Sequence, residues 1–193
     1  MSGQLRVNII TDEAGTGSPD FVNGVRVAGV TQTQAFTGST IVQMTAQAST
    51  SGTSIPFTGI PAGVKRITVM LAGVSTNGSS NLLVQLGTSG GFVTSGYSSG
   101  STSGGGSPVF SSSGLLLTST NGSGNSTFGL YTICALGDDS FSAHGGFRVN
   151  ASNAPLTSSG GVSLGAAITS LRLTTVNGTD TFDAGTVNVL YEL

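Results

Sequence analysis

Alternating apolar and polar positions mark the stretch from Ile55 to Gly87. Its first run places branched apolar side chains at every second position, at Ile67, Val69 and Leu71. This is the period-2 pattern of a strand with one buried face. The run stops at Asn77-Gly78, a pair that readily adopts the positive φ angles of a tight reversal, and a second alternating run covers Leu82–Leu86. The sequence therefore predicts a β-hairpin here.

The same alternation recurs toward the C-terminus. Phe128–Leu136 is apolar on both faces, which favours a central strand. Leu171–Leu173 alternates ahead of Asn177-Gly178, which predicts a second hairpin with the run Val187–Tyr191. Further strands are expected near 39–46, 109–118, 141–149 and 168–176. No window combines helical periodicity with caps. Many short strands between Gly, Asn and Ser turns predict an all-β fold, an antiparallel β-sandwich of jelly-roll type.

Segments rich in turn formers separate these strands. Gly90–Ser107 is dense in Gly and Ser and is expected to be a long loop with a weak edge strand, and Asn150–Gly161 is expected to be a loop. Residues 1–35 contain too few apolar side chains for a core of their own. We interpret them as an extended N-terminal arm, with the β-sandwich domain covering residues 36–193.

Composition restricts the classes of partner. Hydrophobic residues make up 37% of the 193 residues and charged residues only 7%, against about 25% in ordinary domains. No apolar run approaches the about 20 residues of a spanning helix, so membrane insertion is not expected. Six basic residues and a net charge of −2 give no electrostatic footprint for nucleic acid. A weakly charged, hydroxyl-rich surface favours self-association or docking on a larger body.

The residues that usually carry chemistry are few. Cys134 lies among apolar neighbours and is expected to be a small buried hydrophobe, and His144 is expected on a strand surface or loop. Asp138-Asp139, Asp180 and Asp183 occupy turn-like contexts; turn chemistry explains them best, with a calcium site and a catalytic acid pair as the alternatives. The sequence predicts no enzyme, no cofactor and no metal site.

Aromatic side chains are the remaining candidates for ligand contact. Tyr97, Tyr131, Phe92 and Phe110 have the ring surfaces that stack on sugars. Core packing accounts better for most of them. Tyr97, in its Gly/Ser-rich stretch, is expected to be the exposed exception.

Three blocks of the sequence carry a family resemblance. The block from Phe57 to Gly87, with its motif FTGIPAGVKRITVMLAGVSTNG, resembles a module of tailed-bacteriophage virion proteins, and the block Leu171–Glu192 resembles the end of that module. Ile10–Phe21 and the pair Asn23-Gly24 are similar to the N-terminal segment of many phage fibres, which often has Pro where this chain has Val22.

The resemblance implies a structural virion protein assembled in the host cytoplasm. By this resemblance the chain is a short tail fibre or adsorption appendage, usually a homotrimer that contacts other virion proteins. Its arm would anchor it through residues of the matching segment, Asp12, Glu13, Pro19, Phe21 and Asn23. If it binds a host surface glycan, the expected contacts are Tyr97, Asn121, Asp138 and Asp139.

Three alternatives remain open. A capsid decoration or cement protein fits the shortness of the chain. A glycan-degrading enzyme would need paired acids across a groove, and a non-viral glycan-binding module would leave the N-terminal block unexplained.

Overall fold

The structure is a computed structural model that describes residues 25–27, 30–32, 41–137, 139–150, 152 and 155–193. The chain divides into two units, residues 1–38 and residues 39–193. In the first unit, β1 (Val25–Val27) pairs antiparallel with β2 (Val30–Gln32). The segment Leu5–Thr11, whose sequence is compatible with one short strand, lies outside the described residues.

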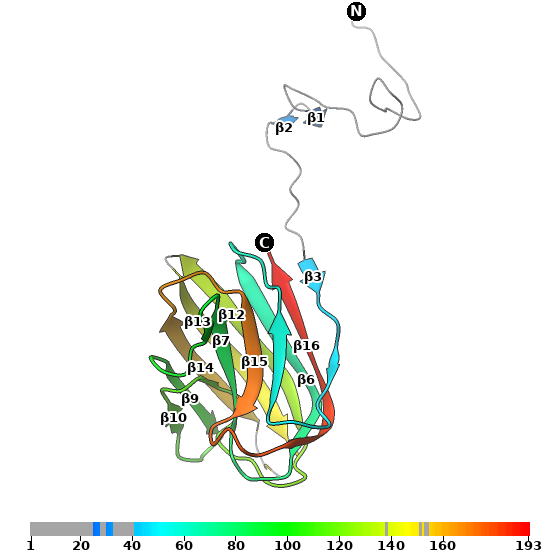
Figure 1. The fold of residues 1–193 in the computed structure, drawn as a ribbon, viewed down its shortest axis with the longest axis vertical. Coiled ribbons are helices and arrows are strands. Elements are labelled where there is room, and N and C mark those ends of the chain that lie inside the picture. The colour runs from blue at the N-terminus through cyan, green and yellow to red at the C-terminus, as the bar shows by residue number, and fades with distance from the viewer. Residues whose placement is uncertain (1–24, 28–29, 33–40, 138, 151, 153–154) are drawn as a thin grey trace, which may run out of the picture. The chain divides into compact units, whose positions relative to one another are not determined.

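The larger sheet of the second unit runs in the order β10-β9-β14-β13-β12-β6-β16-β3, and β4 also pairs with β16 (Figure 1). Its strands are β3 (Ile41–Gln43), β4 (Gln47–Ala48), β6 (Arg66–Thr76), β9 (Ser98–Ser103), β10 (Val109–Ser111), β12 (Thr127–Gly137), β13 (Ser140–Val149), β14 (Leu156–Ser163) and β16 (Phe182–Glu192). All of these pairs are antiparallel.

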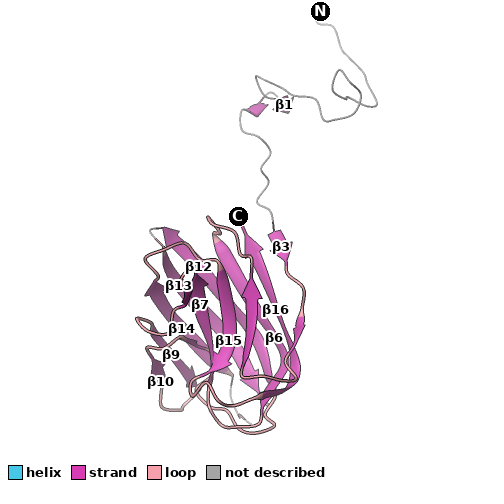
Figure 2. Cartoon of the chain, viewed as in Figure 1, coloured by secondary structure: helices cyan, strands magenta, loops and turns pink. Residues whose placement is uncertain are grey.

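A smaller antiparallel sheet has the order β11-β7-β15-β5, with β8 also paired to β7. Its strands are β5 (Ser54–Thr58), β7 (Leu82–Thr88), β8 (Gly91–Phe92), β11 (Leu115–Leu116) and β15 (Ser170–Thr175). The two sheets form two layers of strands (Figure 2). The described part of the chain contains no helix. The fold is an all-β sandwich, as predicted, while the jelly-roll connectivity stays a prediction.

The core lies between the two sheets and is built by the predicted alternation. Along β6, Ile67, Val69 and Leu71 point inward and are at most 5% exposed. The facing sheet contributes Leu82, Val84, Leu86, Leu171 and Leu173 to the same cluster. Complete burial of one such side chain contributes about 1.5–3 kcal/mol, so this layer is the main source of stability.

The two predicted hairpins are wrong in their pairing. Strand β6 does not pair with β7 after Asn77-Gly78; the two strands belong to different sheets, and so do β15 and β16 around Asn177-Gly178. Alternation predicts a strand but not its partner. Packed sheets lie about 10 Å apart, and the five residues 77–81 are long enough to cross that distance. A two-residue hairpin turn would be too short.

Hydrogen bonds join the two crossings to each other. The Asn77 amide donates to the Thr181 carbonyl at 2.9 Å, and the Thr181 amide returns a bond of 2.9 Å to Asn77 Oδ1. Asp180 Oδ2 accepts from the Ser80 amide at 2.9 Å, and Asp180 Oδ1 accepts from Asn177 Nδ2 at 2.6 Å. The Asp180 carboxylate therefore serves turn structure, as the sequence indicated.

Two expected loops contain strands. The Gly/Ser-rich stretch 90–107 forms β8 and β9, and β9 lies inside the larger sheet between β10 and β14. The stretch 150–161 contains most of β14. Small residues fit here because alternate serines face inward and are held by hydrogen bonds to backbone carbonyls. The expected strand at 109–118 is split into β10 and β11, which belong to different sheets.

Strand β12 is central, as predicted, because it pairs with both β6 and β13. Its inward residues Tyr131 and Ile133 are fully buried. Its outward residues are not covered: Phe128 is 50% and Leu130 is 55% exposed. Cys134 also lies on the outward face and is half-buried, so the expectation of a core cysteine is wrong.

Candidate functional site

An open trough of about 530 Å³ lies where β9, β10 and β14 meet. Its lining consists of Ser98, Ser99, Gly100, Ser101, Thr102, Pro108, Phe110, Thr157, Ser158, Ser159 and Gly160. The strand register places Phe110 opposite Gly100, and Gly100 opposite Ser159. Three strands from distant parts of the sequence thus bring one aromatic ring and several hydroxyl groups to the outward face of the larger sheet.

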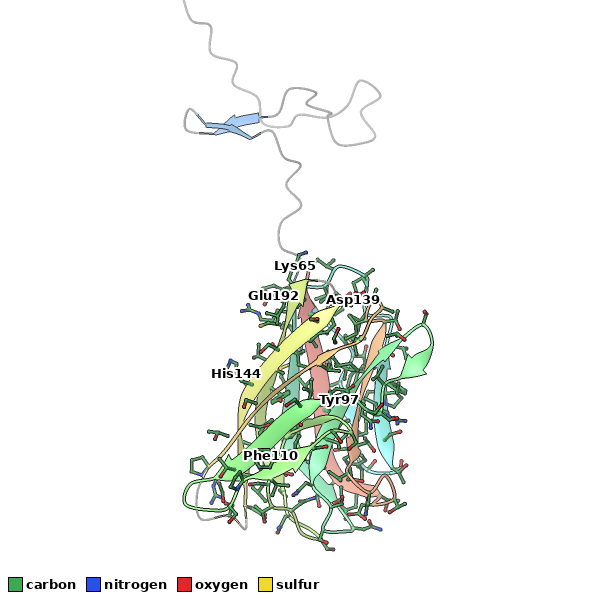
Figure 3. All side chains as sticks on the ribbon, turned by 90° about the vertical axis from the view of Figure 1, so that its left-hand side faces the viewer. Lys65, Tyr97, Phe110, Asp139, His144 and Glu192 are labelled. Carbon is green, nitrogen blue, oxygen red and sulfur yellow. The ribbon has the colours of Figure 1, made fainter. Side chains whose placement is uncertain are left out.

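Phe110 is the most exposed large hydrophobic residue among those described, at 76%. Its ring packs against the backbone of Gly100: a Cβ built there would lie 3.0 Å from Phe110 Cδ1. Figure 3 shows Phe110 at the β9–β10 end of the sandwich. Because Gly100 has no side chain, one side of the Phe110 ring lies directly against the backbone, while most of the ring surface stays in solvent.

Inward-facing serines fix the strands beneath the trough. Ser99 Oγ donates to the Gly114 carbonyl at 2.7 Å and accepts from the Leu116 amide at 3.0 Å. Ser101 Oγ donates to the Leu117 carbonyl at 3.3 Å, and Ser158 Oγ donates to the Leu116 carbonyl. These buried bonds tie β9 and β14 to segment 114–117 of the opposite layer, so the floor of the trough is a fixed surface.

The trough is electrically neutral. Its lining includes no acidic or basic side chain. The outward hydroxyls of Ser98, Thr157 and Ser159 are exposed and make no side-chain hydrogen bond with another described residue. Each hydroxyl can donate one hydrogen bond and accept two. The arrangement can bind a neutral, polyhydroxylated surface, and its lining contains no acidic or basic side chain that could activate one of these hydroxyls.

Tyr97, the expected stacking residue, is buried. It is only 4% exposed and belongs to the hydrophobic core. Its hydroxyl accepts from the Leu86 amide at 2.8 Å and donates to the Val93 carbonyl at 3.1 Å. The expectation that Tyr97 is the exposed aromatic residue is wrong, because the phenol instead satisfies backbone groups beside β7. A glycan contact of Tyr97 stays a prediction, which this burial disfavours.

Alkaline pH is expected to weaken the fold through the buried tyrosines. Burial raises the pKa of Tyr97 to about 12, although the hydrogen bond from the Leu86 amide lowers this pKa in part. Burial likewise raises the pKa of Tyr131 to about 12, and the Ser158 side chain lowers it in part. The unfolded value is about 10, so the folded state holds more protons between about pH 10 and 12. The two protonated tyrosines therefore contribute their full stabilisation of the fold below about pH 10, and this stabilisation is lost as the pH rises toward 12.

The expected loss is about 2 kcal/mol of unfolding free energy for each tyrosine at pH 12. Urea denaturation at several pH values above 9 measures it, and Tyr131→Phe should remove one of the two contributions. A stability that does not change over this range contradicts the account.

Asn121 and Asp139, two of the other predicted glycan contacts, do not line the trough. Asn121 is half-buried in the crossing turns, where its Nδ2 donates to the Ser80 carbonyl at 2.8 Å. Asp139 has a φ of 55° in the β12–β13 connection and lines a different pocket, together with Lys65. Figure 3 shows Asp139 near the end of the sandwich away from Phe110. Asp138 lies outside the described residues, so its role stays a prediction.

The arm residues Asp12, Glu13, Pro19, Phe21 and Asn23 also lie outside the described residues, and their anchoring role stays a prediction. His144 is exposed on β13, as expected, and projects from the sheet (Figure 3). Within the described residues, no three His, Cys, Asp or Glu side chains cluster as a metal site would require. The same part of the chain has no helix suited to crossing a membrane.

Sequence reasoning placed Phe110 among the aromatic candidates but preferred Tyr97. The alternation of side chains along β10 could have identified Phe110 as the exposed residue. Val109 and Ser111 face one side of the strand, so Phe110 between them faces the opposite side. The serines and threonines of the trough carried no signal, because their segments were expected to be loops. No protein-family model matches this chain, and a search of curated proteins also finds no match.

Proposed function

We propose that this chain is a non-catalytic structural virion protein of a tailed bacteriophage, a short adsorption appendage anchored by its N-terminal arm. The proposal starts from the resemblance of three sequence blocks to phage virion proteins. The observation that carries it further is spatial: two of these blocks, 57–87 and 171–192, form one continuous part of the fold.

The two blocks meet in both sheets. In the larger sheet β6 pairs with β16 from Arg66 to Thr76. In the smaller sheet β15 lies between β5 and β7. The turns of the two blocks are joined by the hydrogen bonds at Asn77 and Asp180. This contiguity is expected if the two blocks belong to one folding unit, and it supports treating the two resemblances as one.

The surface supports an assembled rather than a freely diffusing protein. The chain carries fourteen acidic and basic residues in total, from 6 Lys and Arg plus 8 Asp and Glu. The outward face around β12 exposes Phe128 and Leu130, beside half-buried Met70. Low charge gives little repulsion between copies, and exposed apolar side chains gain from being covered.

We propose a homotrimer in which a second copy covers this face. The sequence predicts that neighbouring subunits cover the second apolar face of the central strands, at Met70, Ala72, Leu83, Ile133 and Ala135. This prediction needs one correction: Leu83 and Ile133 are 0% exposed within the subunit, so no neighbour can reach them. Ala72 is exposed, and Met70 and Ala135 are half-buried. Phe128 and Leu130 take the place of the two core residues.

The full chain is expected to sediment as a trimer at micromolar concentration, and Phe128→Ser combined with Leu130→Ser should release monomers. The reason is the loss of two large apolar contacts, each contributing about 1–2 kcal/mol at an interface. Sedimentation velocity measures the mass, and Phe110→Ser is the matched control on the same sheet. A wild-type chain that sediments as a monomer contradicts the trimer.

Host adsorption tests the appendage function. Phage particles assembled without this chain should adsorb to host cells more slowly than complete particles. If adsorption is unchanged and the heads instead become fragile, the capsid decoration alternative replaces the appendage.

A further inference from the structure

We propose that the trough beside Phe110 binds a neutral saccharide. This inference rests on the proposed adsorption function and names the class of ligand for it. It relocates the ligand contact from the turns at Asn121 and Asp139 to the outward face of β9, β10 and β14.

The aromatic ring supplies the first part of the chemistry. Phe110 is 76% exposed, although most large apolar residues of the sandwich are buried. Its ring is braced against Gly100 in a fixed register across β9 and β10. A braced ring loses little conformational entropy on binding, and its face attracts the C–H groups of a pyranose ring.

The hydroxyl groups supply the second part. Thr157 and Ser159 are two residues apart on β14 and therefore project to the same side, and Ser98 projects from the adjacent β9. The serines that alternate with them, Ser99 and Ser158, face inward and are already bonded to backbone carbonyls. The outward set can therefore exchange its bonds to water for bonds to sugar hydroxyls, with the inward set holding the strands in place.

The lining also argues against other ligands. Phosphate, nucleic acid and acidic glycans need cationic partners, and the lining has none. Purely apolar ligands need enclosure, whereas this trough is open and carries the exposed hydroxyls of Ser98, Thr157 and Ser159. Its volume of about 530 Å³ falls in the range of about 300–1,000 Å³ typical of ligand sites. A neutral saccharide matches both the ring and the hydroxyls.

Titration of the full chain with maltohexaose, chitohexaose and a galactose-based oligosaccharide tests the proposal by nuclear magnetic resonance. We expect at least one of these probes to bind with millimolar affinity and to shift the amide signals of Gly100, Ser159 and Gly160. Phe110→Ser should weaken that binding about threefold to tenfold, and Phe110→Trp should preserve or strengthen it. Ile41→Ser, which removes another exposed apolar side chain of the same sheet, is the matched control and should leave binding unchanged.

Failure to bind any of the three probes at millimolar concentration overturns the proposal. Binding that shifts signals elsewhere, or that Phe110→Ser does not weaken, overturns it as well. These outcomes concern the isolated protein alone. The virion role is tested separately on particles, so the saccharide site can fail while the virion role stands.

Discussion

Replacing Tyr97 with alanine is expected to lower the free energy of unfolding by about 3–5 kcal/mol, the range for removing a large aromatic side chain from a core. The side chain is 4% exposed and belongs to the same apolar cluster as Leu86. Its removal would also leave the Leu86 amide, now 2.8 Å from the phenol oxygen, without its partner. An unpaired buried donor adds about 1–3 kcal/mol of its own, which overlaps with the cavity cost.

Two further variants separate the causes. Tyr97→Phe keeps the ring and removes only the hydroxyl, so its expected cost is about 1–3 kcal/mol. Phe110→Ala removes an aromatic ring that is 76% exposed and should change stability by no more than about 0.5 kcal/mol. Urea unfolding followed by fluorescence or circular dichroism measures all three. A Tyr97→Ala protein as stable as the wild type would contradict the placement of Tyr97 in the core.

Gly185→Ala is expected to cost about 2–5 kcal/mol. Gly185 lies at an irregularity of the β6–β16 ladder, where the register shifts between Ala184 and Thr186. Its φ is 98°, and a Cβ added there would lie 2.4 Å from the Gly73 carbonyl oxygen. Backbone strain of about 1–3 kcal/mol and overpacking of about 1–3 kcal/mol both apply, since a backbone atom of a paired strand cannot easily move.

Gly165→Ala is the matched control for that variant. Gly165 also has a positive φ, 68°, but no heavy atom comes within 4 Å of an added Cβ. Only the left-handed backbone then opposes alanine, at about 1 kcal/mol. Comparison of the two midpoints of thermal or urea unfolding isolates the steric contribution. If both variants lose the same free energy of unfolding, the close approach of Gly73 to Gly185 does not add to the cost of Gly185→Ala.

The sequence predicted the strands better than it predicted their partners. The alternation of Ile67, Val69 and Leu71 identified β6 and its buried face, and Phe128–Leu136 was identified as a central strand. Asn77-Gly78 is equally compatible with a tight hairpin and with a crossing between sheets. The choice depends on Thr181 and Asp180, a hundred residues away, and no local pattern contains that information.

The weakest sequence inferences concerned segments of small residues. Gly and Ser have low intrinsic preference for strands, so the stretch with β9 was expected to be a loop with only a weak edge strand, and most of β14 was expected to be a loop. Their order comes from buried bonds such as Ser99 to Gly114 and Ser101 to Leu117, which are tertiary contacts. Once those strands are missed, the trough cannot be assembled. Phe110 and Tyr97 then look alike, although one residue stacks outward on Gly100 and the other bonds to Leu86 inside the core.

Electron cryo-microscopy of phage particles assembled with and without this chain tests the virion function most directly. The account predicts that density of a β-sandwich disappears from the tail of particles that lack the chain, and that its loss accompanies slower adsorption. Density that leaves the capsid surface while adsorption continues would contradict the appendage and identify a decoration protein. Particles that look the same with and without the chain would contradict a virion function altogether.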